Sequence, residues 1–196
     1  AEDYKGLTPA RVLAALKDAG AILHGHFQLT SGRHSDTYVQ CARVLEDPAL
    51  TTRLAEAMAA SVADREIDLV AAPAVGGIII GFAVAQALGV KFIFSERQQG
   101  TMTFRRSFTI DPGDRVLVVE DVVTTGGSVA EVIDLVREAG GTVASVTSII
   151  DRGGEKAFDT DYRPLLRLEV ESMEPPECPQ CAAGIPIDSP GSRRLS

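Results

Sequence analysis

Between residues 68 and 150, short runs of strand-forming apolar residues alternate with helical segments, and this alternation restricts the possible folds more than any other feature. The predicted strands cover residues 68–72, 90–94, 115–119, 142–150 and 165–170, and the predicted helices cover residues 75–88 and 128–139. Strands that are apolar on both sides must be covered on both faces, and strands that alternate with helices pair in parallel. The sequence therefore predicts an α/β fold in which a parallel sheet is flanked by helices.

The two ends of the chain depart from this alternation. Residues 27–40 are predicted to form two strands joined by a turn at Ser31 and Gly32. The segment from residue 173 to 196 contains Pro, Gly and Ser throughout and has little periodicity, so we expect an irregular tail on the surface. The 196 residues suffice for one domain with a sizeable core. We therefore predict a single domain over residues 1–172.

Composition narrows the class of protein. The net charge of −8 disfavours a nucleic-acid partner, because that affinity rests on neutralised phosphates. The sequence has no segment with the order of a signal peptide, and its three Cys do not make an even disulfide framework. Residues 70–90 carry no charge, but Pro73 and several glycines interrupt them, so a buried helix is expected and not a membrane span. These features predict a cytoplasmic protein with reduced thiols and no membrane contact.

The motif VLVVEDVVTTGGS, residues 116–128, is the strongest functional signal. An apolar strand ends at two adjacent acids, Glu120 and Asp121, and a loop of small residues leads into a helix. Backbone N–H groups of such a loop and the helix N-terminus suit a phosphate, although neither a Walker nor a Rossmann fingerprint is present. The acids would repel a phosphate, but carboxylates accept hydrogen bonds from sugar hydroxyls and can hold Mg²⁺. A ligand with both a phosphate and sugar hydroxyls fits this motif.

This motif resembles the binding motif for phosphoribosyl pyrophosphate (PRPP) in type I phosphoribosyltransferases. The resemblance implies that family's fold, with a small N-terminal hood over roughly residues 1–45. It implies that Glu120 and Asp121 bind the ribose hydroxyls and favour the positive charge that builds on the sugar, and that Mg²⁺ arrives with PRPP, with Asp121 as a possible ligand. The remaining PRPP-binding residues implied are Val122, Val123, Thr124, Thr125, Gly126, Gly127 and Ser128.

Other segments resemble orotate phosphoribosyltransferases. These are FQLTSGRHS at residues 27–35, APAVGGI at residues 72–78, and IDR at residues 150–152. The resemblance implies transfer of ribose 5-phosphate from PRPP to orotate, giving orotidine 5'-monophosphate and pyrophosphate in pyrimidine biosynthesis. It also implies a homodimer whose active sites share residues across the interface. The residues implied in orotate binding are Thr124, Arg152, Phe27, Ser31 and Gly32.

The chain also departs from that family. The best-known members carry Lys at the positions of Thr30 and Gly76, and a mobile loop rich in Lys and His, whereas residues 95–106 here contain neither. Arg97 stands where the family's basic loop begins, so it is the candidate cation for the leaving pyrophosphate; a surface ion pair is the alternative. Residues 95–114 are long for a plain connection and are predicted to form a hairpin or a mobile flap, with a short strand at residues 101–104.

Two other functions stay open. A purine-type phosphoribosyltransferase would keep the PRPP motif but would use an aromatic platform for its base, whereas Arg152 suits the anion orotate. A non-catalytic PRPP-sensing regulator is expected to add a DNA-binding segment, which this acidic sequence does not contain.

Cys178 and Cys181 form a C-x-x-C pair in the tail. Two free thiols are the simplest interpretation; a redox pair or a zinc site shared between subunits are the alternatives. A four-ligand zinc site would need Cys41, a His or a second subunit. The three His share no recognised metal spacing and are interpreted as local polar residues.

Overall fold

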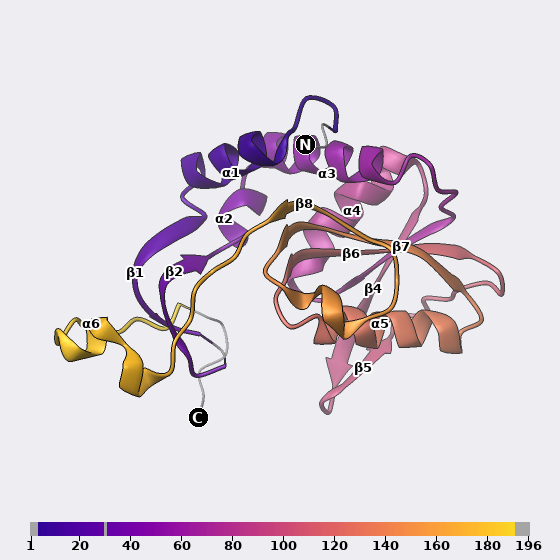
Figure 1. Cartoon of the computed structure of the whole chain (residues 1–196). Coiled ribbons are helices and arrows are strands. Elements are labelled where there is room, and N and C mark those ends of the chain that lie inside the picture. Colours follow the sequence, from indigo (N-terminus) through magenta and orange to yellow (C-terminus); the bar gives the residue numbers. More distant parts are fainter. Residues whose placement is uncertain (1–3, 30, 191–196) are drawn as a thin grey trace.

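The structure is a computed structural model, and it describes residues 4–29 and 31–190. Its main sheet has six strands in the order β5-β4-β3-β6-β7-β8, all parallel except the edge pair β4 and β5 (Figure 1). The strands of this sheet are β3 (Leu69–Pro73), β4 (Lys91–Gln98), β5 (Thr101–Phe104), β6 (Arg115–Val123), β7 (Thr142–Asp151) and β8 (Tyr162–Arg167). The predicted α/β class is confirmed.

Helices cover the sheet on both faces (Figure 1). One face carries α1 (Pro9–Asp18), α3 (Pro48–Ser61) and α4 (Gly76–Leu88), and their apolar residues share a buried core with Leu117, Ile149 and Ile150 of the sheet. The other face carries α5 (Gly127–Glu138), which buries Val129, Val132 and Val136. This double coverage is the reason that β3 and most of β6 are apolar on both sides.

The segment after β4 is a tight hairpin and not a flap. Strand β4 runs on to Gln98, and Gln99 and Gly100 turn the chain directly into β5. Both turn residues have positive φ, 51° and 87°, which matches the twist of a two-residue hairpin. The short strand expected at residues 101–104 is confirmed. Gly100 therefore serves the turn geometry.

Helix α4 is less buried than its sequence suggests. The expectation of a buried helix is wrong for one side of it, because Ile79 and Phe82 are 52% and 60% exposed, and Val75 just before the helix is 81% exposed. The other side is buried through Ile80 and Val84. Over the described residues, the structure has no helix of sufficient length and apolar character to cross a membrane.

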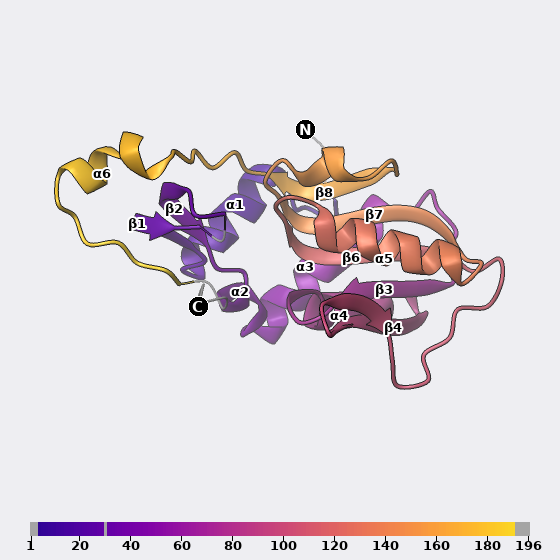
Figure 2. The same ribbon diagram turned by 90° about the horizontal axis from the view of Figure 1, so that it is seen from below.

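The N-terminal part forms a separate two-stranded sheet beside the main one, from β1 (Ile22–Gln28) and β2 (His34–Val39), followed by the short helix α2 (Ala42–Leu45) (Figure 2). The first strand starts before the predicted residue 27, because pairing with β2 draws the polar segment around His24 into the strand despite its weak strand propensity. Thr30, at the predicted turn, lies outside the described residues, whereas Leu29 and Arg33 close that turn through an N–H···O bond of 2.8 Å.

The tail was expected to be irregular, but it contains the 3-10 turn η2 (Pro175–Glu177) and the short helix α6 (Pro179–Ala182). After β8 it runs along β2, where Met173 and His34 exchange two backbone hydrogen bonds of 2.9 Å. It then turns through α6 and returns along β1, where Asp188 pairs with His26 and Gln28 (Figures 1 and 2). The tail therefore holds both edges of the hairpin.

Candidate active site

A cavity of about 780 Å³ opens between the N-terminal hairpin and the carboxyl ends of the main strands, where ligands bind in parallel α/β sheets. Its volume lies in the usual range for small-molecule sites. Strand ends and the hairpin bring together residues that lie far apart in the sequence. Six of the predicted site residues line it: Ser31, Asp121, Val122, Thr124, Thr125 and Arg152.

The acid pair sits near the end of β6, which continues past the predicted residue 119 to Val123. Asp121 faces the cavity, and its Oδ1 accepts a hydrogen bond of 2.8 Å from Val122 N–H. Glu120 is only 9% exposed, and its carboxylate lies against the start of α4 at Gly77. Burial therefore separates the two acids: of the pair, Asp121 lines the cavity and Glu120 does not.

Glycines at the start of α4 make room for both carboxylates. A Cβ on Gly76 would lie 2.8 Å from Asp121 Oδ1, and a Cβ on Gly77 would lie 3.1 Å from Glu120 Oε1. Any larger residue at position 76 requires the Asp121 carboxylate to move. This close approach gives a physical reason for Gly76, where the chain departs from the Lys of the family that it resembles.

Burial and neighbouring charge set the protonation of the groups around the acids. The pKa of Glu120 is raised well above its ordinary value, first by burial and then by the charge of Asp121. Burial also raises the pKa of the Cys41 thiol, with Asp121 and Glu120 acting in the same direction. The pKa of Tyr38 is raised by burial, while Arg152 opposes this shift. Burial is thus the first cause of each of these shifts, and the charge of Asp121 adds to it.

Arg152 is held at the end of β7 with its side chain half-buried against the cavity. Its backbone N–H donates to Val123 O at 2.8 Å, and buried Asp151 fixes the following turn by accepting N–H bonds of 2.9 and 3.1 Å from Gly153 and Gly154. Burial lowers the pKa of the guanidinium, although it stays a cation at neutral pH. Its Nε is buried without a hydrogen-bond partner among the described residues. A half-buried guanidinium whose buried Nε–H has no acceptor suits an anionic ligand.

The loop after the two acids has small residues, which let a ligand come close to its backbone. Gly126 has a φ of 77°, and a Cβ there would lie 2.4 Å from Gly154 O, so this position requires glycine. Thr124 and Thr125 stand exposed before it, and α5 begins at Gly127. The N-terminus of a twelve-residue helix next to exposed hydroxyls is a favourable place for a phosphate.

Several predicted residues do not line the cavity. Phe27 is 5% exposed and packs on Tyr38 with ring centroids 5.7 Å apart, so it belongs to the core of the hairpin. Glu120 and Val123 are buried, and residues 126–128 carry the chain from the loop into α5. The predicted residues outside the cavity lining are Phe27, Gly32, Glu120, Val123, Gly126, Gly127, Ser128 and Arg97.

Arg97 is held away from the cavity by an ion pair. Its Nη1 and Nη2 bind the two carboxylate oxygens of Glu131 on α5 at 2.9 and 2.6 Å, and Nη1 also donates to Gly100 O. In this arrangement Arg97 does not reach the cavity of its own chain, where the leaving-group role was expected. The alternative of a surface ion pair is what the structure contains, with Glu131 as the partner. Glu96 pairs with Arg106 instead.

Sequence reasoning missed two groups of residues. Tyr38 of the hairpin, Gln40 just after it, Ser172 just before the tail and Pro190 of the tail also line the cavity. Because tail and hairpin reach the cavity only through long-range pairing, no local pattern marks these residues. The second group is a cluster of His26 and His34 with Cys178 and Cys181, so the interpretation as local polar residues missed the contacts of these two histidines with the cysteines.

Comparison with known proteins agrees with the geometry. Residues 41–177 match the model of the phosphoribosyl transferase domain family. An orotate phosphoribosyltransferase from Chlorobium phaeobacteroides (strain BS1) is 50% identical over 190 residues, which cover 96% of this chain and 98% of that relative. The orotate phosphoribosyltransferase of Pelotomaculum thermopropionicum is 50% identical over 191 residues, covering 96% and 100%.

This chain belongs to the orotate phosphoribosyltransferase family. A solved structure of the orotate phosphoribosyltransferase from Aeropyrum pernix is similar in fold, with a TM-score of 0.69 and 28% identity over 80% of this chain and 93% of that one. The resemblance drawn from residues 27–35, 72–78, 116–128 and 150–152 is thereby confirmed, as are the phosphoribosyltransferase fold and the class of enzyme, a pentosyltransferase.

The buried acid Glu120 gives a stability prediction. Folding raises the pKa of Glu120, so the stabilising contribution of the protonated form is complete at low pH and is lost as the pH rises from 4.5 through the raised value. Glu120→Gln should therefore stabilise the ligand-free protein at neutral pH by at least about 1 kcal/mol, or roughly 2–4 °C in melting temperature, with little gain near pH 4.5. Thermal unfolding over a pH series measures this; equal gains at all pH values would contradict it.

Proposed function

We propose that this chain transfers the ribose 5-phosphate group of PRPP to orotate, releasing pyrophosphate and forming orotidine 5'-monophosphate. The observation that carries the proposal is the presence of Asp121 and Arg152 in the lining of one cavity. A carboxylate suits ribose hydroxyls and a developing positive charge, while a half-buried guanidinium suits the carboxylate of orotate. High identity to orotate phosphoribosyltransferases over nearly the whole chain supports the same reaction.

Each residue has a proposed role. Asp121 binds the ribose hydroxyls and stabilises the cationic sugar as pyrophosphate leaves, and Glu120 supports it from the buried side. Residues 122–128 hold the 5-phosphate through the loop and the N-terminus of α5. Thr124, Ser31 and Arg152 contact orotate, and Gly32 and Phe27 shape the turn that presents Ser31. Tyr38, whose pKa responds to both Arg152 and Asp121, joins this pocket wall.

The donor groups fit Mg²⁺. This ion prefers oxygen ligands and retains several waters, so it is commonly held by one or two carboxylates together with substrate phosphates. Asp121 offers a carboxylate on the cavity wall, and this group is the candidate protein ligand. When bound, Mg²⁺ would neutralise part of the pyrophosphate charge.

The assay that tests the proposal uses purified protein, PRPP and Mg²⁺ with orotate, adenine or hypoxanthine in separate reactions. Pyrophosphate release with orotate alone is the expected result. Turnover with a purine would instead support the purine-type alternative. PRPP binding without turnover of any base would support a non-catalytic regulator.

We also propose that the enzyme is a homodimer. Val75, Ile79 and Phe82 are exposed apolar residues spaced so that they share one side of α4, and Val75 also lines the cavity. An interface there would place two active sites close to each other, as the family resemblance implies. In such a dimer the β4–β5 hairpin of one protomer can reach the active site of its partner. Arg97 on that hairpin would bind pyrophosphate there only after its ion pair with Glu131 has broken. The free thiols and the biosynthetic reaction suit the cytoplasm.

A charge placed on this apolar face should break the dimer. Phe82→Glu is expected to yield a monomer at micromolar concentration, because a buried unpaired carboxylate costs several kcal/mol. Light scattering coupled to gel filtration measures the mass. Arg137→Glu, on the exposed side of α5, is the matched control and should stay dimeric. A wild-type protein with monomer mass would contradict the proposal.

A further inference from the structure

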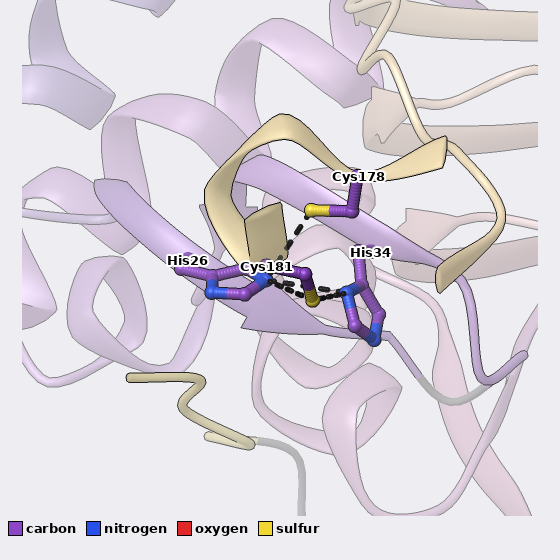
Figure 3. Close-up of side chains that lie close together, drawn as sticks. All are labelled: His26, His34, Cys178 and Cys181. Carbon is purple, nitrogen blue, oxygen red and sulfur yellow. Dashed lines mark hydrogen bonds between the residues drawn. The ribbon is translucent and has the colours of Figure 1, made fainter. Parts of the chain in front are cut away.

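Two histidines of the hairpin and two cysteines of the tail meet in one cluster, which lies apart from the cavity lining. His26 comes from β1 and His34 from β2, while Cys178 lies just before α6 and Cys181 lies in its first turn (Figure 3). One nitrogen of each imidazole and both sulfur atoms lie within 4.8 Å of one another. We refer to these four residues as the Cys₂His₂ cluster.

Local structure explains why the four side chains converge. In the hairpin, Gln28 pairs with His34, so His26 and His34 are diagonal neighbours on the same face. In the tail, residues three apart on a helical turn point the same way, which brings Cys178 and Cys181 to one side. The tail then pairs with both edges of the hairpin and lays this side against the two imidazoles.

The distances are those of a metal site. His26 Nε2 lies 3.2 Å from His34 Nδ1, 3.4 Å from Cys178 Sγ and 3.6 Å from Cys181 Sγ, and His34 Nδ1 lies 3.3 Å from Cys181 Sγ. A tetrahedral Zn²⁺ with its usual bond lengths separates two nitrogen ligands by about 3.3 Å and a nitrogen from a sulfur by about 3.6 Å. These four separations are thus already close to those of a zinc tetrahedron, and the remaining two pairs of ligand atoms lie within 4.8 Å.

The surroundings orient the ligands. His26 Nδ1 donates a hydrogen bond of 2.8 Å to the carbonyl of Ile185, which leaves the Nε2 lone pair directed into the cluster. His26, His34 and Cys178 are 4%, 6% and 3% exposed, whereas Cys181 is exposed and leaves a path for the ion to enter. Two thiolates would balance the charge of Zn²⁺, so the buried site would be neutral.

A redox pair or a disulfide accounts for the cluster less well than a metal ion does. Cys181 is accessible as the attacking thiol of a redox pair, but such a pair gives no role to the two imidazoles that lie against the sulfur atoms. All three cysteines are free, and the imidazoles would have no role in a Cys178–Cys181 disulfide. The four ligands come from one chain, so neither Cys41 nor a second subunit is needed.

We propose that the Cys₂His₂ cluster binds one structural Zn²⁺ that fastens the tail to the N-terminal hairpin. All four ligands are protein side chains, which is the pattern of a structural site and leaves no open position for catalysis. The site also has a consequence for the cavity. Leu29 and Ser31 at the hairpin turn, Ser172 just before the tail, and Pro190 after the tail has returned along β1, line the cavity wall. Zinc therefore fixes the position of that wall.

Metal content tests the proposal directly. The full chain is purified without a histidine tag, and zinc is measured by plasma mass spectrometry after gel filtration. About one zinc per chain is expected. His26→Ala and Cys178→Ala should each lose most of it. His24→Ala, on the same strand but exposed, and Cys41→Ala are matched controls that should retain it.

A second measurement keeps the test valid if a ligand variant fails to fold. Wild-type protein is stripped with a chelator and reloaded with Co²⁺, which should give the visible bands of a tetrahedral site and thiolate-to-cobalt charge transfer. Hydrogen exchange in residues 174–188 should rise when the metal is removed and fall when zinc returns. Absence of bound zinc together with an octahedral cobalt spectrum would overturn the proposal. So would a Cys178–Cys181 disulfide, one equivalent of iron in place of zinc, or equal zinc loss in the control variants.

Discussion

The Asp121→Asn variant is expected to turn over at least about tenfold more slowly than the wild type, a loss of about 1.4 kcal/mol of transition-state stabilisation. Asp121 is the acid that faces the cavity, and its carboxylate lies where the sugar is proposed to gain positive charge. Asparagine keeps the size of the side chain but removes the negative charge. Steady-state kinetics with PRPP and orotate measure the effect.

Melting temperatures and a control variant distinguish a loss of charge at Asp121 from a loss of folded protein. The Asp121→Asn protein should melt at or slightly above the wild-type temperature, because the side chain is partly exposed and the change removes a negative charge beside Glu120. Asp134→Asn makes the same chemical change on the exposed side of α5 and should retain full turnover. Near-normal turnover of Asp121→Asn would remove the sugar-binding role from this residue.

Arg152→Ala is expected to raise the Michaelis constant for orotate by about tenfold to about a hundredfold, and that for PRPP much less. A charge-assisted hydrogen bond contributes about 1.5–3 kcal/mol, and each 1.4 kcal/mol corresponds to a factor of about ten. The guanidinium has no ion-pair partner among the described residues, and its Nε has no hydrogen bond, so its removal breaks little of the ligand-free structure. Initial rates over a grid of both substrate concentrations give the two constants.

Two further variants show what the guanidinium contributes. Arg152→Lys keeps the charge but loses the planar fork, so an intermediate Michaelis constant for orotate is expected. Arg53→Ala removes an exposed arginine from α3 and should leave both constants unchanged. An equal rise for orotate and PRPP in Arg152→Ala would indicate that Arg152 acts by holding the loop after β7.

Local patterns were sufficient for the elements that carry the PRPP motif. The apolar strand, the acid pair and the loop of residues 124–128 are contiguous, so the sequence alone predicted their order, the helix that follows and the end of the sheet where they lie. The order of these elements follows from periodicity and from the geometry of parallel sheets, which short segments encode. The Arg152 prediction rested instead on the resemblance of residues 150–152 to the orotate family, and the structure brings this residue to the same cavity as Asp121.

Tertiary structure decided what depends on segments far apart in the chain. Arg97 lies just past the apolar run of β4, yet its position is set by Glu131 on α5, an ion pair that no local pattern indicates. The Cys₂His₂ cluster likewise forms because the tail pairs with both edges of a hairpin about 150 residues earlier, as contacts between distant segments require. The C-x-x-C spacing left two free thiols, a redox pair and a zinc site open. Only the folded chain placed His26 and His34 beside the two cysteines.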